Sequence, residues 1–220
     1  MNILEAYIKV YNQFIVVISG ISGCKKTKVA REISKLLNIP FINQFEYYKS
    51  DYNKEITIKH KNNEIKIIDW DNPEAIDWDQ FNNDVNNLKS KGLVISCSNV
   101  DPKFINFNIN YQIHLSMSKK TCIEKRINFL EKKKGNDLYN DDYKLLENNM
   151  FKTKMYEYTF PNYDNIIKNM KINKFINTSD LTDEQIIDTI WDIIISYIQI
   201  TMDNFNKSDY FYWSKNNSFT

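Results

Sequence analysis

The chain has 220 residues, of which 42% are hydrophobic, and its formal net charge at pH 7 is +1. A single domain of this size buries roughly 70% of the surface that its unfolded chain exposes, so it needs no metal or disulfide to fold. The nearly neutral charge excludes the strong overall field that draws basic proteins to nucleic acid or to anionic membranes. We therefore expect no nucleic-acid partner, and any phosphate-binding site has to be local.

The cysteines and the absence of long apolar segments indicate the compartment. Cys24, Cys97 and Cys122 are widely spaced and form no CxxC pair, which argues against a disulfide framework and a zinc site. Residues 1–14 lack the basic start and the long apolar run of a signal peptide, and no apolar stretch reaches about 18 residues. We expect a soluble cytoplasmic protein without membrane contact, and a homo-oligomer is compatible with the sequence.

The first predicted elements form a helix, a strand, a turn and a second helix in that order. Apolar positions at helical spacing predict a short leading helix over 3–12. The β-branched run 14–18 predicts a strand that is buried on both faces of a parallel sheet. Residues 26–37 carry apolar side chains at i, i+3/4 and i+7/8, which predicts a helix that packs one face.

The rest of the chain continues the alternation of strands and helices. The predicted elements are a strand at 40–42, a β-hairpin over 54–69, a helix over 77–88, strands at 93–96 and 111–115, helices over 118–134 and 142–157, and a terminal helix over 183–202. Alternation of this kind predicts an α/β fold with a parallel sheet of about five strands and helices on both faces. We expect one domain over 1–202 and a poorly ordered tail over 203–220, where no periodicity remains.

A phosphate-binding loop is predicted between the first buried strand and the helix that follows it. The octet 20–27, GISGCKKT, matches G-x-x-x-x-G-K-[ST] at every fixed position except Lys25, which replaces the second glycine. In such loops backbone N–H groups surround phosphate oxygens, the lysine reaches the outer phosphates and the hydroxyl ligates Mg²⁺. The predicted nucleotide-binding residues are Gly20, Ser22, Gly23, Cys24, Lys25, Lys26 and Thr27, with Thr27 as the Mg²⁺ ligand.

Lys25 weakens this match. A residue other than glycine at positive φ costs about 1–2 kcal/mol, and its Cβ would crowd a pyrophosphate. The alternative is an ordinary turn between a strand and a helix that happens to contain Gly, Lys and Thr. The position of the octet after a buried strand and before an amphipathic helix favours the phosphate loop.

A second motif resembles the family of uridine kinases and nicotinamide riboside kinases. Residues 69–77, DWDNPEAID, are similar to the family's N-F-D-H-P-D-A-F-D. The resemblance implies a P-loop kinase with a lid, ATP and Mg²⁺ as cofactors and a nucleoside-like substrate. It also implies that Asp71 binds the ribose hydroxyls and that Trp70 packs near the nucleoside. The alternative is an acidic N-cap region before the helix that starts near Asp77.

A third segment resembles the part of the family that carries its general base. Residues 43–49, NQFEYYK, are similar to S-Q-D-x-F-Y/F-K, and the base position is occupied by Phe45. Glu46 is the neighbouring carboxylate and the candidate substitute base, although neighbouring residues of an extended segment point in opposite directions. Tyr48 matches an aromatic residue of the nucleoside pocket, with core packing as the alternative.

Further matches lie at the metal site and in the lid. The family's glutamate that organises Mg²⁺ corresponds to Cys97, and a thiol cannot replace a carboxylate for a hard cation; Asp101 is a candidate to compensate. The lid, at about 118–145, contains Arg126 at the position of a phosphoryl clamp, with a solvated basic helix face as the alternative. Residues 151–152 and 160–167 are similar to the family's post-lid helix and to the strand that follows it.

The sequence leaves two functions open. The first is an ATP-dependent kinase that moves the γ-phosphoryl group to the 5′-hydroxyl of a ribonucleoside-like substrate of the uridine, cytidine or nicotinamide riboside type. Its catalytic residues would be Lys26, Glu46 and Arg126. The second is a degenerate kinase that binds a nucleotide, a nucleoside or a protein partner without turnover, because its base and its metal-organising acid are missing.

Overall fold

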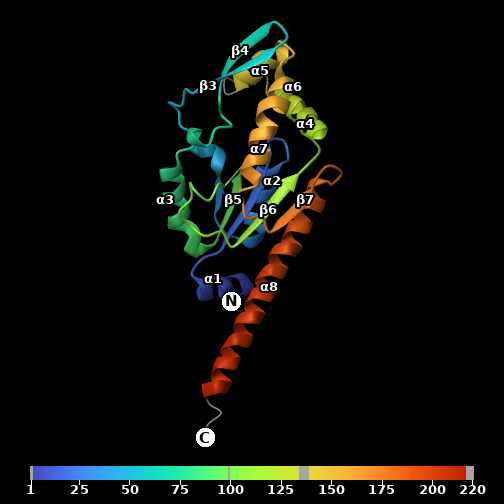
Figure 1. Cartoon of the computed structure of the whole chain (residues 1–220). Coiled ribbons are helices and arrows are strands. Elements are labelled where there is room, and N and C mark those ends of the chain that lie inside the picture. Colours follow the sequence, from blue (N-terminus) through green and yellow to red (C-terminus); the bar gives the residue numbers. More distant parts are fainter. Residues whose placement is uncertain (1, 99, 134–138, 217–220) are drawn as a thin grey trace.

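The computed structural model describes residues 2–98, 100–133 and 139–216, with side-chain environments up to residue 206 (Figure 1). Its main elements are α1 (Ile3–Tyr11), β1 (Ile15–Gly20), α2 (Lys26–Leu37), β2 (Phe41–Asn43), η1 (Gln44–Tyr47), β3 (Glu55–His60), β4 (Asn63–Ile68), η2 (Pro73–Ala75), α3 (Trp78–Leu88), β5 (Leu93–Cys97), β6 (Tyr111–Ser116), α4 (Lys119–Lys132), α5 (Asn140–Glu147), α6 (Phe151–Lys154), the π-helical turn η5 (Met155–Thr159), α7 (Phe160–Ile167), β7 (Lys174–Asn177) and α8 (Asp183–Asn216). Within these residues no helix is both long and apolar enough to cross a membrane.

Within the described residues, five strands form one parallel sheet in the order β2-β5-β1-β6-β7. The central strand β1 is buried along its whole length, as the apolar run 14–18 predicts. Its two neighbours are reached by separate crossovers, so the carboxyl end of β1 is the point where the order of the strands reverses. Crevices at such points are where open α/β sheets bind ligands. The predicted fold class is confirmed.

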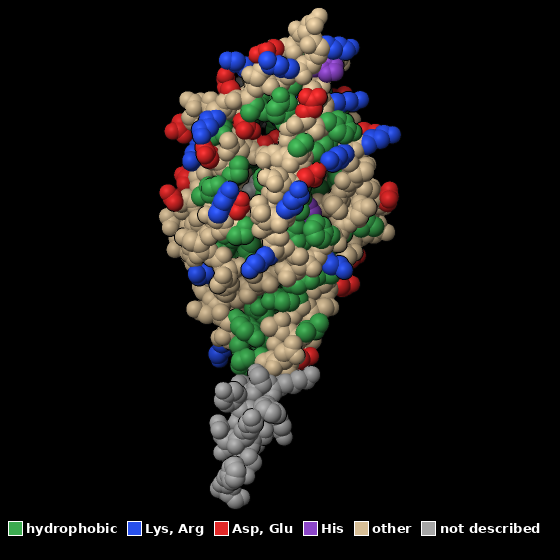
Figure 2. Space-filling model, in the orientation of Figure 1, with side chains coloured by type: hydrophobic (Ala, Val, Ile, Leu, Met, Phe, Trp, Pro, Cys, Tyr) green, Lys and Arg blue, Asp and Glu red, His purple; other side chains and the backbone are tan. Residues whose placement is uncertain are grey.

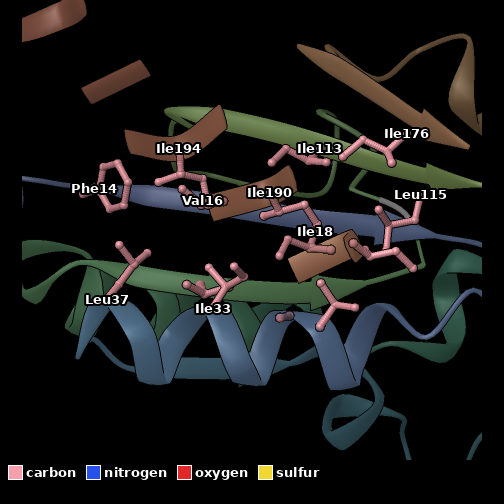
Figure 3. Packing of buried hydrophobic residues seen from close by; sticks show 14 of the residues in the cluster. Phe14, Val16, Ile18, Ile33, Leu37, Ile113, Leu115, Ile176, Ile190 and Ile194 are labelled. Atoms are coloured by element: carbon pink, nitrogen blue, oxygen red, sulfur yellow. The ribbon is translucent and has the colours of Figure 1, made fainter. Parts of the chain in front are cut away.

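Alternate side chains of β1 serve the two faces of the sheet. Val16 and Ile18 belong to the core cluster that contains Ile33 of α2 and Ile190 of α8 (Figure 3). The alternate residues of β1, Ile15 and Val17, belong to a separate cluster on the other face of the sheet, which α3 covers. The α3 residues Phe81 and Val85 are fully buried in the same cluster. Because both faces are covered by apolar side chains, β1 is held in one place, and so is the loop that leaves its end.

The hairpin predicted over 54–69 is present as β3 and β4, joined through a turn with Lys61 at φ 54°. Ile58 and Ile67 belong to a second core cluster together with Phe151 and Leu145. The hairpin, α4, α5 and α6 therefore share one apolar core that lies beyond the carboxyl edge of the sheet (Figure 1).

The face of the molecule in Figure 2 carries basic and acidic side chains that are interspersed and not separated by sign.

Two predictions for the segment 142–167 are wrong. The single helix over 142–157 is divided, because α5 ends at Glu147 and Asn149 adopts a left-handed conformation at φ 56°. The segment 160–167 is the helix α7 and contains no strand; the strand that follows is β7. Pro161 lies at the second position of α7, directly after the π-helical turn, where the α-helical hydrogen-bond pattern is already interrupted.

The predicted end of the terminal helix at 202 is also wrong, because α8 continues to Asn216. The sequence 203–216 is polar and aromatic but contains neither glycine nor proline, so nothing in it breaks the helix. The ring of Phe205 on α8 contacts Tyr11 of α1 at 6.2 Å between centroids. The last part of the predicted tail, 217–220, lies outside the described residues.

A buried polar network crosses the sheet beneath the β1 loop. The Nδ1 atom of His114 lies 3.0 Å from Ser19 Oγ, its Nε2 atom lies 3.4 Å from the Tyr163 hydroxyl, and Gln112 donates to Ser19 Oγ at 3.3 Å. Only 2% of His114 is exposed. Burial, assisted by the positive charge of Lys26, lowers the pKa of His114 to about 4. The imidazole is therefore neutral in the folded protein at neutral pH.

We expect stability to fall as the pH falls from about 6.5 to about 4. Over this range the unfolded chain protonates His114 and the folded chain does not, so acid favours unfolding, by up to about 3 kcal/mol in total. Urea unfolding at several pH values measures the effect, and His114→Gln should flatten the profile over this range. An unchanged profile in that variant would show that His114 is not the group responsible.

Candidate functional site

The candidate site begins where β1 leaves the sheet. Gly20 ends the strand, and α2 starts at Lys26, so the octet 20–27 forms the turn between them. The side chain of Lys25, the N-cap residue, makes no capping bond, and the first turn of α2 contains no acidic residue. The positive end of the helix dipole is thus not neutralised by its own first turn, which suits an anion.

The backbone of this loop requires its glycines at two positions. Gly23 adopts φ 93°, in the left-handed half of conformational space. A Cβ on Gly20 would lie 2.4 Å from Cys24 Sγ and 2.6 Å from the Leu115 carbonyl oxygen, which leaves no room for a side chain. The first and fourth residues of the octet are therefore glycines for local steric reasons, and the loop is wrapped tightly against β6.

Lys25 adopts the left-handed conformation that the missing glycine would have, with φ 65°. Its ammonium binds Asp183 at the start of α8. Lys28 binds the other oxygen of the same carboxylate at 2.5 Å. These two hydrogen bonds lower the pKa of Asp183. Lys25 thus connects the loop to α8, and its ammonium is occupied there.

Lys26 is the buried cation of the loop, with 4% of its surface exposed. Burial lowers its pKa, and the nearby charge of Arg126 adds to the lowering. Its Nζ atom lies 5.0 Å from the centroid of the Phe45 ring, a cation–π contact. Phe45, at the position of the family's general base, therefore covers the ammonium with an aromatic face.

Thr27 and its surroundings offer few ligands to a metal. Its Oγ1 atom lies 3.0 Å from Ser96 Oγ on β5, and the next residue, Cys97, is a fully buried thiol whose pKa is raised by burial. In the part of the chain that the structure describes, no three His, Cys, Asp or Glu side chains are placed to hold a metal ion. Asp101 binds the backbone N–H and the ammonium of Lys103. Any Mg²⁺ bound here would rely on Thr27, phosphate oxygens and water.

The three cysteines are free, buried thiols, and two of them lie in contact with the loop or within it. Cys122 of α4 donates to the Ser22 carbonyl at 3.1 Å, and its pKa is raised by burial to about 11. Burial likewise raises the pKa of Cys24. A Cβ placed on Gly23 would lie 3.5 Å from the Cys122 carbonyl oxygen. The start of α4 therefore packs directly on the phosphate loop.

The residues matched to the nucleoside pocket lie together. The Tyr48 hydroxyl donates to the Trp70 carbonyl at 3.2 Å, and the two rings meet edge to face with centroids 5.5 Å apart. The ring of Phe45 also contacts Tyr48, at 5.7 Å between centroids. Asp71 follows Trp70 and accepts a hydrogen bond from Thr159 Oγ1 at 2.7 Å. A chain of aromatic contacts thus connects the Lys26 ammonium to the residue that precedes Asp71.

Arg126 of α4 is part of a nearly buried ion network. Its Nη2 atom binds Asp142 at 2.7 Å, and Lys154 binds the other oxygen of Asp142 at 3.1 Å. Burial opposes ionisation of Asp142, but the charges of Lys154 and Arg126 outweigh it and lower its pKa. Two cations share this carboxylate, and the charge of Asp71 also acts on Lys154. Its residues belong to α4, α5 and α6, on the side where α4 packs on the loop.

Glu46, the predicted substitute base, lies on a different side of the segment from Phe45, which contacts Lys26. Glu46 is exposed, its side chain accepts from Asn43 at 3.4 Å, and it lines a surface groove of about 350 Å³ beside α3 together with Tyr47 and Asp84. Phe45 instead occupies the side that faces Lys26. Residues 44–47 form the 3₁₀ turn η1, in which successive side chains point about 120° apart, so Phe45 and Glu46 face different directions.

Sequence reasoning missed four residues of the site. They are Asp142, Lys154, Thr159 and Asn162. All lie on the segment 140–167, where the predicted helix and strand boundaries are wrong. With the boundaries of α5 and α6 known, the charged residues Asp142 and Lys154 could have been chosen as candidates. The hydroxyl of Thr159 gives no signal in the sequence.

Comparison with known proteins agrees with the motifs on which the resemblance rests. Residues 15–97 match the model of the family described as "Phosphoribulokinase / Uridine kinase family". Over 104 residues the chain is 32% identical to the nicotinamide riboside kinase of Saccharomyces cerevisiae, an alignment that covers 45% of this chain and 41% of that protein. The chain thus aligns with less than half of the relative's length. The expected resemblance is confirmed over this part of the chain.

Two solved structures share the general arrangement at low identity. A gluconokinase from Sinorhizobium meliloti is 10% identical with a TM-score of 0.49, covering 89% of this chain and 97% of that one. The YorR protein of Bacillus subtilis, in complex with phosphorylated GDP, is 14% identical with a TM-score of 0.47, covering 82% and 95%. Because both scores lie below 0.5, the fold assignment rests on the chain's own strand order.

The left-handed conformation of Lys25 predicts a difference between two substitutions. Lys25→Ala keeps a Cβ at positive φ and Lys25→Gly does not, and both lose the bond to Asp183. We expect the Gly variant to be more stable than the Ala variant by about 1 kcal/mol in urea unfolding. Lys28→Ala is the control, because it removes the other partner of Asp183 and leaves the loop backbone alone. A Gly variant less stable than the Ala variant would contradict strain at this residue.

Proposed function

We propose that the chain is an ATP-dependent phosphotransferase of the nucleoside kinase type, which moves the γ-phosphoryl group to the 5′-hydroxyl of a ribonucleoside-like substrate. The observation that carries the proposal is the chain of contacts that runs from the Lys26 ammonium through the rings of Phe45 and Tyr48 to Trp70, the residue before Asp71. Arg126 is close enough to Lys26 to lower its pKa. The charges of Arg126 and Asp71 both act on the Tyr48 hydroxyl. A phosphate loop and a ribose-binding carboxylate at one site suit phosphoryl transfer.

The proposed roles follow from the charges of the site. ATP supplies the transferred phosphoryl group, and its phosphates would lie at the positive end of α2 with Lys26 beside them. Burial lowers the pKa of Lys26, and an anion in this position would favour its charged form. Arg126 supplies a planar guanidinium on the lid side, which can bind phosphate oxygens in pairs. Asp71 would orient the acceptor through its sugar hydroxyls.

No carboxylate stands at residue 45, the position of the family's general base, to accept the proton of the attacking hydroxyl. Phe45 cannot accept a proton, and Glu46 faces the groove beside α3. General-base assistance is typically worth about 10²–10⁴ in rate, whereas phosphoryl transfer depends mainly on positioning and charge neutralisation. We therefore propose a slow kinase in which positioning by Lys26, Arg126 and Asp71 supplies most of the acceleration.

A second candidate is a protein that binds nucleotide or nucleoside without turnover. The contact of Phe45 with Lys26 favours it, since the ring lies over the cation that would contact the phosphates. The thiol of Cys97 at the position of the metal-organising glutamate favours it as well. The two candidates differ in product formation and agree on the binding sites.

Lys26→Ala tests the premise that both candidates share, which is that the loop 20–27 binds the phosphates of a nucleotide. ATP with Mg²⁺ should raise the melting temperature of the wild-type chain, because a ligand that binds only the folded state stabilises it. The variant should lose this shift, since it lacks the buried cation of the loop. Lys28→Ala, whose ammonium faces Asp183, should keep it. A shift that persists in Lys26→Ala would place nucleotide binding elsewhere. A phosphotransfer assay over uridine, cytidine and nicotinamide riboside then separates the two candidates.

Phe45→Asp should increase turnover if the chain is a slow kinase. The substitution returns a carboxylate to the side of the segment that faces Lys26, and we expect kcat to rise by about tenfold or more. Phe45→Asn is the matched control, because it opens the same space and cannot act as a base of similar strength. Equal rates in the two variants would mean that space, and not proton transfer, limits the reaction. Turnover in neither variant would favour the binding protein.

A further inference from the structure

The ribose-binding candidate Asp71 is held by a segment that belongs to neither of the recognised motifs. Thr159 Oγ1 donates to Asp71 Oδ2 at 2.7 Å, and Asn162 Nδ2 donates to the Asp71 carbonyl oxygen at 3.0 Å. Thr159 and Asn162 are three residues apart, so they lie on one face of a helix. Both the side chain and the backbone of Asp71 are therefore fixed by the helical segment 155–167.

The π-helical turn sets the direction of Thr159. The Phe160 N–H donates to the Met155 carbonyl, five residues earlier, and not to the carbonyl four residues earlier. One extra residue in a turn shifts the side chains around the helix axis by about 100° relative to a continuous α-helix. Such turns are often found at functional sites. Tyr158, in the same turn, donates to the Thr57 carbonyl of β3 at 3.0 Å and fixes the turn to the hairpin.

We propose that Thr159, oriented by the π-helical turn, is a positioning residue that fixes the Asp71 carboxylate to receive the two neighbouring hydroxyls of a ribose. The inference rests on the proposed function, since it takes a ribonucleoside as the ligand of Asp71. The inference also assigns Thr159 a role in specificity, because an Asp71 carboxylate held in this direction favours a sugar with two neighbouring hydroxyls over a deoxy sugar.

The count of acceptor sites supports this geometry. An ionised carboxylate has about four lone-pair sites, and Thr159 occupies one of them on Oδ2. The remaining sites on both oxygens are enough for two hydroxyl donors. The terminal torsion of an aspartate is broad when nothing fixes it, so the hydrogen bond from Thr159 removes a rotation that a ribose would otherwise have to arrest. Preorganisation of this kind increases affinity by reducing the entropy lost on binding.

A second buried threonine, Thr153 of the preceding helix α6, provides a matched comparison. Thr159 is 8% exposed, and its contact with Asp71 is a hydrogen bond to a charged acceptor. Thr153, on the preceding helix α6, is similarly buried at 9%, and its Oγ1 atom lies 2.9 Å from His60 Nδ1. The two threonines thus have the same chemistry and burial but different partners. Removal of the Thr159 hydroxyl should cost more stability, because hydrogen bonds to a charged acceptor are stronger than those to a neutral one, and only Thr159 should affect the ligand of Asp71.

Calorimetric titration of the 220-residue chain with uridine, nicotinamide riboside and 2′-deoxyuridine tests the inference. Thr159→Val, which removes the hydroxyl and keeps the shape, should weaken riboside binding about tenfold, or about 1.4 kcal/mol. Binding of the deoxyriboside should change less, so the variant discriminates less between the two sugars. Thr159→Ser should restore both, and Thr153→Val should behave like the wild-type chain.

Further variants separate the possible failures. Thr159→Ala repeats the experiment if the valine side chain disturbs folding, and circular dichroism shows whether each variant is folded. If Asp71→Asn weakens riboside binding and both Thr159→Val and Thr159→Ala bind like the wild-type chain, the inference is overturned and the proposed acceptor site stands. If Asp71→Asn has no effect on riboside binding, the acceptor site itself is wrong and the inference falls with it.

Discussion

A buried ammonium without a carboxylate partner is the feature on which the site depends. Among the described residues, no carboxylate forms an ion pair with Lys26, which is 4% exposed and faces the Phe45 ring. Burying an unpaired charge is costly by several kcal/mol, and a ring face recovers only part of that cost. The loop therefore favours an anion at this position, and the uncapped start of α2 adds to the preference.

The elements beyond the sheet are arranged around this charge. The start of α4 packs on Gly23, and Arg126 extends from α4 to Asp142 and, through it, to Lys154. This network places two cations and one carboxylate on the side of the loop where α4 packs. The segment with Trp70 and Asp71 brings aromatic surface and a carboxylate to the same region. The arrangement suits a ligand that is anionic at one end and carries a sugar at the other.

The departures from the family pattern concern proton transfer and the metal. Asp71, Lys26 and Thr27 stand at the positions that resemble the family's sugar-binding carboxylate, its loop lysine and its loop hydroxyl. The base and the metal-organising acid are replaced by Phe45 and Cys97, neither of which carries a negative charge in its present environment. The residue types expected for binding are therefore present, whereas those expected for proton transfer and for the metal are replaced. This difference is the physical reason that turnover and binding have to be measured separately.

The order of the strands and helices up to α4 and the tight turn of the octet 20–27 between β1 and α2 could be predicted without coordinates, because they depend on local periodicity and on spacing within short motifs. The apolar run 14–18 and the octet 20–27 needed no distant partner to be recognised. The direction of Glu46, the contact of Phe45 with Lys26 and the partners of Arg126 emerged only from the folded chain. Each depends on which side of a segment faces a residue far away in the sequence. The hydrogen bond from Thr159 to Asp71 also depends on a single extra residue in one helical turn, and the hydrophobic pattern of 142–167 does not encode that change of register.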